Sequence, residues 1–455
     1  MRKQALSCSG FALAAMAGVS NAATITVDTN DDPIGANLCP AVCSLRHAIT
    51  AASVIGGDTI VFAPNLASPI TLTQGEIQID RPLTIRGPGA RALTISAQNA
   101  SRVLVAYASA TISDLEIAHG TMTGANGADG ANLGEAGAPG ASAAGGCVLI
   151  PGGVDVVFDR VAIRDCRATG GNGGNGVAGL PGPPLIASSN GGAAGNATGG
   201  AIDLHGTLSL LDSSVVDAHA IGGTGGKGGH ANGGLVLDGF SGDGGSASGG
   251  AIYAHDGAGL RIANSTIANG FSTAGNSPTT LVLGHGGNAT AGLVFVGSGV
   301  MPADLEFSTL ANGTVVAGTG LGHATASANA INAGTNLVVL SSIIVGAQSG
   351  VTLCAAAPTS APGSVNLGED ASCGFSAQAT FAQTLNPLDI TATPWPAYAP
   401  VAGGPAVDAA ATCLDIAGQA VTADQHGAPR PQGAKCDLGA IEFQPDDIFA
   451  DGFDG

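Results

Sequence analysis

Three groups of residues in this sequence could do chemistry. Near the C-terminus, Asp424, Arg430 and Asp437 bring two carboxylates and a guanidinium together, as an acid–base site would. Two glycine-rich stretches, GGTGGKGG around Lys227 and GFSGD around Ser241, are the kind that can hold a phosphate or a nucleophile. The third group is the cysteines, whose thiols form disulfides or bind metals.

Neither glycine-rich stretch completes a catalytic motif. Gly228 follows Lys227 where a phosphate-binding loop carries Ser or Thr to coordinate Mg²⁺, and no strand–helix context surrounds it. GFSGD has Asp243 where a nucleophile elbow needs its second glycine, and the sequence contains no HExxH motif. We therefore assign no catalytic residue, no cofactor and no metal ligand.

The cysteines favour a disulfide framework. Nine are present, and Cys8 lies in an apolar N-terminal segment, which leaves eight, an even number. Eight cysteines allow about 105 connectivities. A zinc site is the alternative, but no CxxC pair or Cys/His spacing of the right kind supports it. Proximity in sequence suggests the pairs Cys39–Cys43, Cys147–Cys166, Cys354–Cys373 and Cys413–Cys436.

The N-terminus indicates export, and the charge balance argues against two classes of partner. In residues 1–22, Arg2 and Lys3 precede an apolar run that ends in small residues at Ala22, as in a secretory signal peptide. No later run of about 20 apolar residues would span a membrane. The formal net charge of −19 argues against nucleic acid and against an anionic membrane as partners. The predicted location is extracellular or on a bacterial cell surface.

A repeated unit must position these residues, and Gly249–Gly270 shows it most clearly. Apolar residues alternate there with a period of two and flank a small polar turn, Asn264–Thr266. Leu208 aligns with Leu260, and Val215 with Ile267. Equivalent apolar positions in all the copies are Leu83, Leu115, Val161, Val215, Ile267, Leu310 and Ile343.

One such unit cannot bury its own apolar face, so the units must stack. The repeat predicts an all-β fold, a single-stranded right-handed parallel β-helix, with handedness from the general crossover preference. Five positions should form one internal ladder: Val161, Val215, Ile267, Leu310 and Ile343.

Glycine tracts separate the repeated units, at 124–146, 170–200, 222–250 and 284–299. They lack core-forming side chains, which favours flexible or loosely ordered loops on one flank. The alternative is extended glycine helices packed side by side against that flank, or a surface that contacts a partner. GANGADGAN has a Gly-x-y period but lacks the proline of collagen.

Pectin-degrading hydrolases share the predicted fold, so their motifs are relevant. Gly284-His285-Gly286 resembles their Gly-His-Gly, but the aspartates that should precede it are missing. A hydrolase needs two carboxylates about 5 to 9 Å apart, and no clustered acid pair is apparent. We therefore predict no product from pectins or alginate.

Residues from Thr24 onward resemble the CSLREA domain, an N-terminal module of exported bacterial β-helix proteins. Cys43, Ser44, Leu45 and Arg46 match its motif, and His47 replaces the family's Glu. The stretch 44–53 also reads as a short amphipathic helix that would plug the open end of the first rung. His47 is expected on its surface. The acidic run 28–32 is expected to be a solvated turn, since it lacks the glycine of a calcium loop.

Residues 403–443 resemble the choice-of-anchor Q domain, a C-terminal module of exported proteins. The residues that match its motif are Asp424, Gln425, Gly427, Pro429, Arg430, Pro431, Cys436, Asp437, Gly439, Ala440 and Glu442. We expect a structural role for this group, with Arg430 paired to a carboxylate inside the cap.

The sequence thus divides into a signal peptide (1–22), a helical N-terminal cap (23–76), a β-helix with glycine-rich insertions (77–350), a disulfide-bearing C-terminal cap (351–443) and an acidic tail (444–455). The tail holds two of the twelve Phe residues. It is expected to be either a disordered polar end or a segment that a sorting receptor reads or a partner binds. The leading functional hypothesis is a non-catalytic structural or adhesive protein that contacts an extracellular glycan or a surface protein. The alternative is a polysaccharide hydrolase or lyase.

Overall fold

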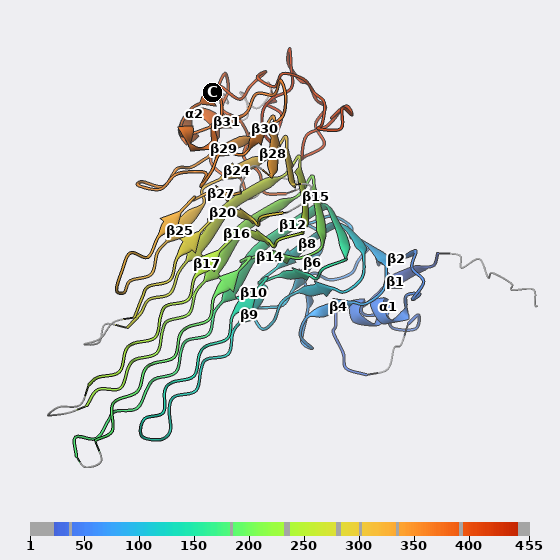
Figure 1. Cartoon of the computed structure of the whole chain (residues 1–455). Coiled ribbons are helices and arrows are strands. Elements are labelled where there is room, and N and C mark those ends of the chain that lie inside the picture. The colour runs from blue at the N-terminus through green and yellow to red at the C-terminus, as the bar shows by residue number, and fades with distance from the viewer. Residues whose placement is uncertain are drawn as a thin grey trace, which may run out of the picture.

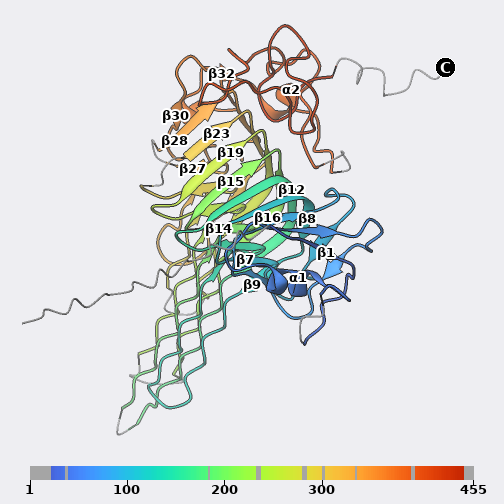
Figure 2. The same cartoon turned by 90° about the vertical axis from the view of Figure 1, so that its right-hand side faces the viewer.

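The computed structural model describes residues 22–35, 39–182, 185–231, 237–278, 284–299, 303–333, 336–390 and 395–444. Over these residues the chain winds into a right-handed parallel β-helix, and long glycine-rich hairpins leave one flank side by side (Figure 1). The C-terminal region lies at one end and the N-terminal helix near the other (Figure 2). The predicted signal peptide and tail lie outside the described residues, apart from Ala22 and Gln444.

Three parallel sheets form the β-helix. The long sheet contains β1 (Thr24–Val27), β2 (Asp58–Phe62), β3 (Ile70–Thr71), β5 (Leu83–Arg86), β6 (Thr94–Ser96), β8 (Ala110–Ala118), β9 (Thr121–Thr123), β12 (Asp155–Thr169), β15 (Thr207–Leu211), β16 (Ser214–Ile221), β19 (Gly259–Ala263), β20 (Thr266–Thr273), β23 (Ala303–Glu306), β24 (Thr309–Ala311), β25 (Thr314–Val316), β28 (Leu337–Leu340), β29 (Ile343–Val345), β30 (Thr359–Ser360), β31 (Leu367–Gly368) and β32 (Ala377–Gln378).

The other two sheets complete each rung. The second contains β4 (Ile77–Ile79), β7 (Leu104–Ala106), β11 (Val148–Ile150), β14 (Ile202–Leu204), β18 (Ile252–Ala254), β22 (Val294–Val296) and β27 (Ile331–Asn332). The third contains β10 (Ala143–Ala144), β13 (Ala197–Thr198), β17 (Ala247–Ser248), β21 (Ala289–Thr290) and β26 (Ala326–Ser327). The helices are α1 (Leu45–Ala51), the 3₁₀ helix η1 (Ala371–Cys373) and α2 (Phe381–Thr384).

The strand register confirms the centre of the predicted ladder. Leu208 pairs with Leu260, Val215 with Ile267, and Ile267 with Leu310. All five side chains are buried. Apolar side chains on alternate positions of stacked rungs therefore form the core of the β-helix.

Both ends of the predicted ladder were wrong. Val215 pairs with Ile163 instead of Val161, which itself pairs with Leu115. At the other end, Leu310 pairs with Ile344, one residue beyond the predicted Ile343.

Leu83 was also misplaced, because it pairs with Ala110 in the first half of β8 and not with Leu115. The slip at Val161 is by two residues, which preserves the in–out alternation, so the apolar pattern does not detect it.

A buried serine ladder closes the turn between β15 and β16 and its equivalents. The N–H of Ser213 donates to Ser265 Oγ at 3.1 Å, and the N–H of Ser265 donates to Ser308 Oγ at 3.1 Å. The residue before each serine is left-handed, with φ of 47° at Asp212 and 52° at Asn264. Asp and Asn tolerate this conformation, so the predicted polar turn is also a backbone requirement.

Helix α1 covers the open end of the first rungs, as predicted. Ser44 is its N-cap and accepts the N–H of His47 at 3.3 Å, while Leu45 packs into the core. Two expectations were wrong. His47 is buried, not on the surface. Asp32, expected in a solvated turn, is buried and bonded to Arg46 at 2.8 Å, because a guanidinium compensates the buried carboxylate.

The eight cysteines form four disulfides with the predicted pairing: Cys39–Cys43, Cys147–Cys166, Cys354–Cys373 and Cys413–Cys436. Disulfides persist in oxidising compartments, which supports an extracellular location. Among the described residues, no helix has the length and apolar character needed to cross a membrane.

Candidate functional site

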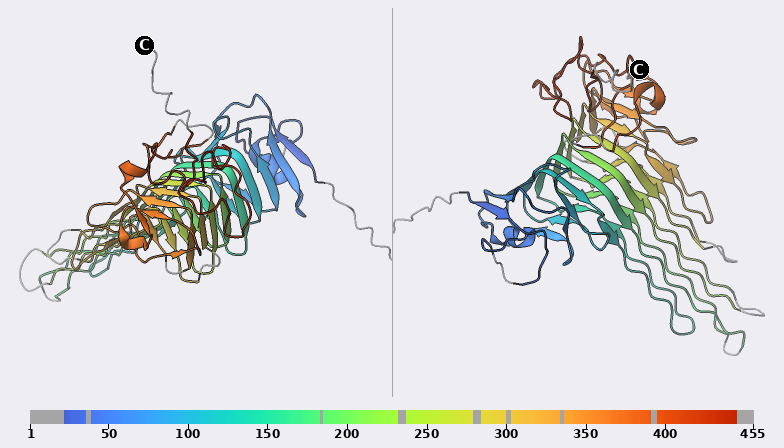
Figure 3. Two further views of the ribbon diagram at one scale, coloured as in Figure 1. Left: turned by 90° about the horizontal axis from the view of Figure 1, so that it is seen from above. Right: turned by 180° about the vertical axis from the view of Figure 1, so that it is seen from behind.

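The glycine tracts form an ordered array, which we call the glycine array: the described parts of 124–144, 170–198, 222–248, 274–290 and 317–326. Within it, the N–H of Gly124 donates to Thr169 O at 2.8 Å, and three residues later Gly127 donates to Asn172 O at 2.8 Å. A three-residue period without strand pairing is that of polyproline II-like helices. Seen from behind, the hairpins again run parallel to one another (Figure 3).

The array has two layers, because each hairpin runs out and back. The N–H of Ala138 on the returning segment donates to Ala128 O on the outgoing segment at 2.8 Å. The layers also interlock between hairpins, since the N–H of Gly174 on the second hairpin donates to Ala138 O of the first at 2.9 Å. In a loose loop the backbone N–H and C=O groups would bond to water, whereas in the array they bond to each other.

The absence of a Cβ makes this packing possible. A Cβ on Gly174 would lie 2.0 Å from Ala128 O, and one on Gly192 would lie 2.0 Å from Ala138 O. Neither glycine has a left-handed φ, so space alone excludes a side chain. Flexible loops were the favoured prediction and were wrong. The composition that removes a side-chain core also lets backbones approach closely enough to bond.

The first hairpin differs from the others. Where the second hairpin has Gly171, Gly174, Gly192 and Gly195, the first has Ala125, Ala128, Ala138 and Ala141. Those glycines face the carbonyls of the preceding hairpin, and the first hairpin has none before it. Its alanine methyls therefore mark the outer edge of the array and obstruct the addition of a further glycine helix.

Every third residue of the array points outward and is held in a row. Asn126 Oδ1 accepts the N–H of Asn172, and Asn172 Oδ1 accepts the N–H of Thr224, both at 2.8 Å. We call the outgoing layer's exposed surface the outgoing face and the other the returning face. The outgoing face carries Asn126, Asp129, Asn172, Asn175, Thr224, Lys227, Asn276 and Thr319. The returning face carries Pro139, Ala193, Asn196, Asp243, His285 and Asn288.

His285, in the Gly-His-Gly sequence, belongs to the returning face. Its N–H donates to Asp243 Oδ1 at 2.7 Å, and its Nδ1 lies 2.9 Å from Leu321 O. A Cβ on Gly286 would lie 2.4 Å from Gly318 O. The glycines around His285 are thus explained by backbone packing in the array.

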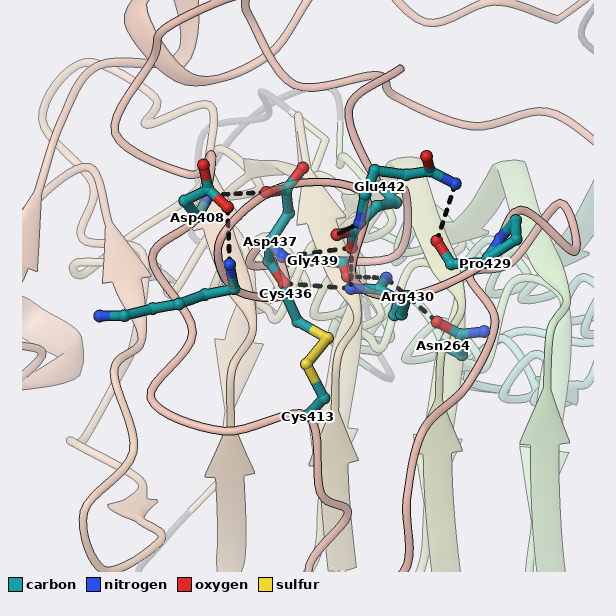
Figure 4. Close-up of a disulfide and its surroundings, with 11 residues drawn as sticks. Asn264, Asp408, Cys413, Pro429, Arg430, Cys436, Asp437, Gly439 and Glu442 are labelled. Carbon is teal, nitrogen blue, oxygen red and sulfur yellow. Dashed lines mark hydrogen bonds and ion pairs between the residues drawn. A yellow bond between two sulfur atoms is a disulfide. The ribbon is translucent and has the colours of Figure 1, made fainter. Parts of the chain in front are cut away.

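Arg430 organises the C-terminal region, as the sequence predicts. Its guanidinium is fully buried, lies 3.1 Å from Glu442 Oε2 and donates to Gly439 O at 2.7 Å (Figure 4). It also donates to Asn264 Oδ1 of the β-helix at 3.2 Å. Burial lowers the pKa of Arg430, and the nearby carboxylates, Glu442 first, oppose this. The expected ion pair is confirmed.

The remaining motif residues attach this region along the side of the β-helix. Gln425 accepts a hydrogen bond from Thr266 Oγ1 at 2.6 Å and donates to Ser213 O at 2.9 Å. The N–H of Gly439 donates to Ser341 O at 2.9 Å. Three different rungs are contacted, so the region crosses the rungs in addition to closing an end.

Within the motif, several residues shape the local backbone. Asp424 Oδ2 accepts the N–H of Glu442 at 2.9 Å, and Asp437 Oδ1 accepts the N–H of Asp408 at 2.6 Å. Gly427 is left-handed with φ of 85°. Pro429 O accepts Gln432 Nε2 at 3.1 Å, and the peptide before Pro431 is cis.

A cavity of about 280 Å³ lies between this region and the β-helix. Burial raises the pKa of Asp212, on its wall, to about 6, and Asn264 Nδ2 donates to its Oδ1 at 2.6 Å. Glu306, on the same wall, is bonded to Arg261 Nε at 2.8 Å and to the N–H of Ile416 at 2.8 Å. Asp212 is the group with acid–base potential here.

More carboxylates gather nearby than the sequence suggested. Arg160 bonds Asp114 Oδ1 at 2.7 Å and Asp159 Oδ1 at 2.8 Å, and the charges of Asp159 and Arg160 act on Asp212. A group of carboxylates around Arg160 that sequence inspection did not find therefore lies near Asp212. It was missed because its members come from separate rungs.

Sequence inspection also missed a cluster of Asp203, His205 and His255. Asp203 is fully buried, and its Oδ2 lies 3.1 Å from His205 Nε2 and 3.2 Å from His255 Nε2. Thr198 Oγ1 donates to Asp203 Oδ1 at 2.8 Å. The signal was present in the aligned copies GGAIDLH and GGAIYAH, which place the two histidines at one register position.

No protein-family model and no curated protein matches the chain. Among solved structures, it is similar to a pectate lyase at 12% identity, with 94% of this chain and 98% of that chain covered and a TM-score of 0.35. It is also similar to a rhamnogalacturonan lyase at 9% identity, with 80% and 91% covered and a TM-score of 0.28. Scores this low carry no argument about activity, and the fold rests on the strand register above.

Proposed function

We propose that this chain is an exported structural or adhesive protein that presents the outgoing face of the glycine array to a polar partner, a glycan or the surface of another protein. The observation that carries this proposal is the row from Asn126 through Asn172 to Thr224, in which backbone bonds fix the outward side chains. A surface ordered before contact loses little entropy on binding. Loose glycine loops would lose much more.

The outgoing face also has suitable chemistry. Its amides and hydroxyls donate and accept hydrogen bonds, as sugar hydroxyls do. Lys227 is exposed there, and the neighbouring β12 strand exposes Arg167, in a protein with a net charge of −19. Because of these cations, a neutral or acidic partner should prefer this surface to the rest of the acidic molecule.

The two segment resemblances support export and display. In the CSLREA-like segment, Arg46 donates to Gly75 O at 2.8 Å, and in the choice-of-anchor Q-like segment Arg430 reaches Asn264. Arg430 ties its segment to the β-helix, and Arg46 joins its helix to the residues that lead into β4. Membership of these two families and a bacterial cell-surface location belong to the proposal.

A matched pair of variants tests the binding face. One combines Asn172→Asp, Thr224→Glu and Asn276→Asp on the outgoing face. The other combines Asn196→Asp, Ala193→Glu and Asn288→Asp on the returning face. Asp keeps the oxygen that accepts the neighbouring N–H but removes the amide donor.

Binding of the purified proteins to glycan arrays and to bacterial cells is measured. We expect the outgoing-face variant to bind about tenfold or more weakly, and the returning-face variant to bind like wild type. Equal loss in both variants, or no binding by the wild type, would contradict the proposal.

The second candidate function is a polysaccharide hydrolase or lyase, favoured by the raised pKa of Asp212 beside a cavity. Incubation with pectins and alginate, followed by assays for unsaturated and reducing ends, tests it. We expect no product. Product formed by the wild type and lost in Asp212→Asn would replace the adhesive proposal, and His285→Ala serves as the control.

A further inference from the structure

Two histidines from adjacent rungs lie over one buried carboxylate. Strands β14 and β18 pair with Asp203 opposite Tyr253, so His205 and His255 follow at equivalent positions. Their rings stack with centroids 3.7 Å apart. Equivalent residues of neighbouring rungs are about 4.8 Å apart, so a site built this way takes one ligand from each rung.

The carboxylate of Asp203 has hydrogen-bond partners but no fixed countercharge. Its side chain is 1% exposed. Among the described residues, the bonds recorded to it come from Thr198, His205 and His255, with no Lys or Arg. Buried charges in proteins are paired or coordinate metals. A cation at this point would supply the missing charge.

We propose that Asp203, His205 and His255 bind a divalent transition-metal ion such as Zn²⁺. Two imidazoles and a carboxylate are the ligand set of many three-ligand sites, which keep further positions open. The carboxylate Oδ2 of Asp203 lies 3.1 Å from His205 Nε2 and 3.2 Å from His255 Nε2, separations that a pair of metal–ligand bonds of about 2.0–2.2 Å can bridge. Ca²⁺ and Mg²⁺ prefer all-oxygen ligands and are not expected here.

Access and support are in place around the three ligands. The side chains of His205 and His255 are 44% and 31% exposed, so an ion enters from solvent. The rings are only 12° from parallel, so at least one must rotate to aim its lone pair at the ion, and the more exposed His205 has room to do so. Thr198 donates to the carboxylate, as outer-shell groups do in metal sites.

The site lies at the root of the two longest glycine hairpins. β13, which carries Thr198, ends the returning segment of the second hairpin, and β17 ends that of the third. A bound ion would join these rungs immediately beyond the array. The proposal is nevertheless independent of the adhesive function, because it concerns binding of the metal alone.

Metal binding is tested on full-length protein without a histidine tag, stripped with EDTA and dialysed. Titration with Zn²⁺ by calorimetry is expected to show a single ion bound, and Co²⁺ should give the absorption bands of a low-coordinate site. His205→Gln and His255→Gln should each weaken binding by more than the roughly 10–100-fold expected for the outer-shell variant Thr198→Ala. Melting temperature should rise with Zn²⁺ in wild type but not in His205→Gln or His255→Gln.

The matched control is His230→Gln, which removes an exposed histidine that lies 2.9 Å from Asp238 without a second imidazole. It should bind Zn²⁺ like wild type. Circular dichroism confirms that each variant is folded, and because both target histidines are partly exposed, their variants are decisive even if Asp203→Asn fails to fold. Absence of Zn²⁺ binding by wild type, or binding unchanged in His205→Gln/His255→Gln, would show a hydrogen-bonded cluster only.

Discussion

The β-helix and the glycine array grow from the same rungs but are held together by opposite means. In the β-helix, Ile267 and Leu310 stack as buried apolar side chains along the core. In the array, Gly174 and Gly192 contribute no side chain, and backbone hydrogen bonds join the segments. The core should therefore tolerate a change in side-chain volume better than a polar or charged side chain. The array should tolerate a polar side chain better than added volume.

The largest expected effect is in the core. Ile267→Asp buries a charge in a narrow stack of aliphatic residues, which should cost at least about 4 kcal/mol in unfolding free energy. Ile267→Val, which changes volume only, should cost about 0.5–1.5 kcal/mol. Denaturant unfolding of both variants measures the difference, and an Asp variant as stable as wild type would contradict the ladder.

The array should show the inverse sensitivity. Gly174→Ala and Gly192→Ala each add one methyl against a carbonyl, which should cost about 1–3 kcal/mol through overpacking. Ala128→Gly and Ala138→Gly leave the facing carbonyls in place and create no clash. Hydrogen exchange should show lost protection between residues 170 and 250 in the glycine variants only.

Exchange that stays slow in Gly192→Ala would contradict the close packing of the array. Ala193→Ser is the polar counterpart, since Ala193 is exposed and a hydroxyl there faces solvent. It should leave exchange unchanged. The pair separates volume from polarity within two neighbouring residues.

The sequence predicted the β-helix because its rungs obey a period of two around buried turns. Leu208 was aligned correctly because the polar residues Thr207 and Ser209 flank it. Val215 was aligned correctly because the polar turn before it matches the turn before Ile267. Ile343 was misplaced because Ile343, Ile344 and Val345 are all apolar and all buried, so no alternation marks the inward residue.

The alternation of apolar and polar residues does not predict contacts between distant parts of the sequence. Nothing local to Gln425 indicates that it bonds Ser213, more than two hundred positions earlier. Part of the Asp203 cluster could have been predicted, because the aligned repeats place His205 over His255. The buried carboxylate was the missing part, since an alternating pattern assigns it to an outward position of its strand and does not show what covers it.

A smaller effect is expected at the serine ladder. Ser265→Ala removes the acceptor of the Ser213 N–H and the donor to Ala263 O, which lies 2.7 Å away. A buried N–H left without a partner should cost about 1–3 kcal/mol. Ser209→Ala, at a partly exposed position of β15, should change stability by about 0.5 kcal/mol or less. Equal losses would show that the ladder is not special.

The smallest effect is expected where the β-helix meets the C-terminal region, at Asp212. Burial raises its pKa to about 6, above the roughly 3.9 of an exposed Asp. The folded state therefore favours the protonated form, and this stabilisation is complete below about pH 4 and lost as pH rises through about 6.

Asp212→Asn does not ionise and keeps the oxygen that accepts Asn264 Nδ2. Since the side chain is partly exposed, the variant should exceed wild type by only about 1–2 kcal/mol at pH 8, and by nothing at pH 4. Urea unfolding at the two pH values measures this, and a difference independent of pH would mean that folding does not raise the pKa of Asp212. In that case the region of the β-helix that disfavours charged side chains would not extend as far as the cavity that Asp212 lines.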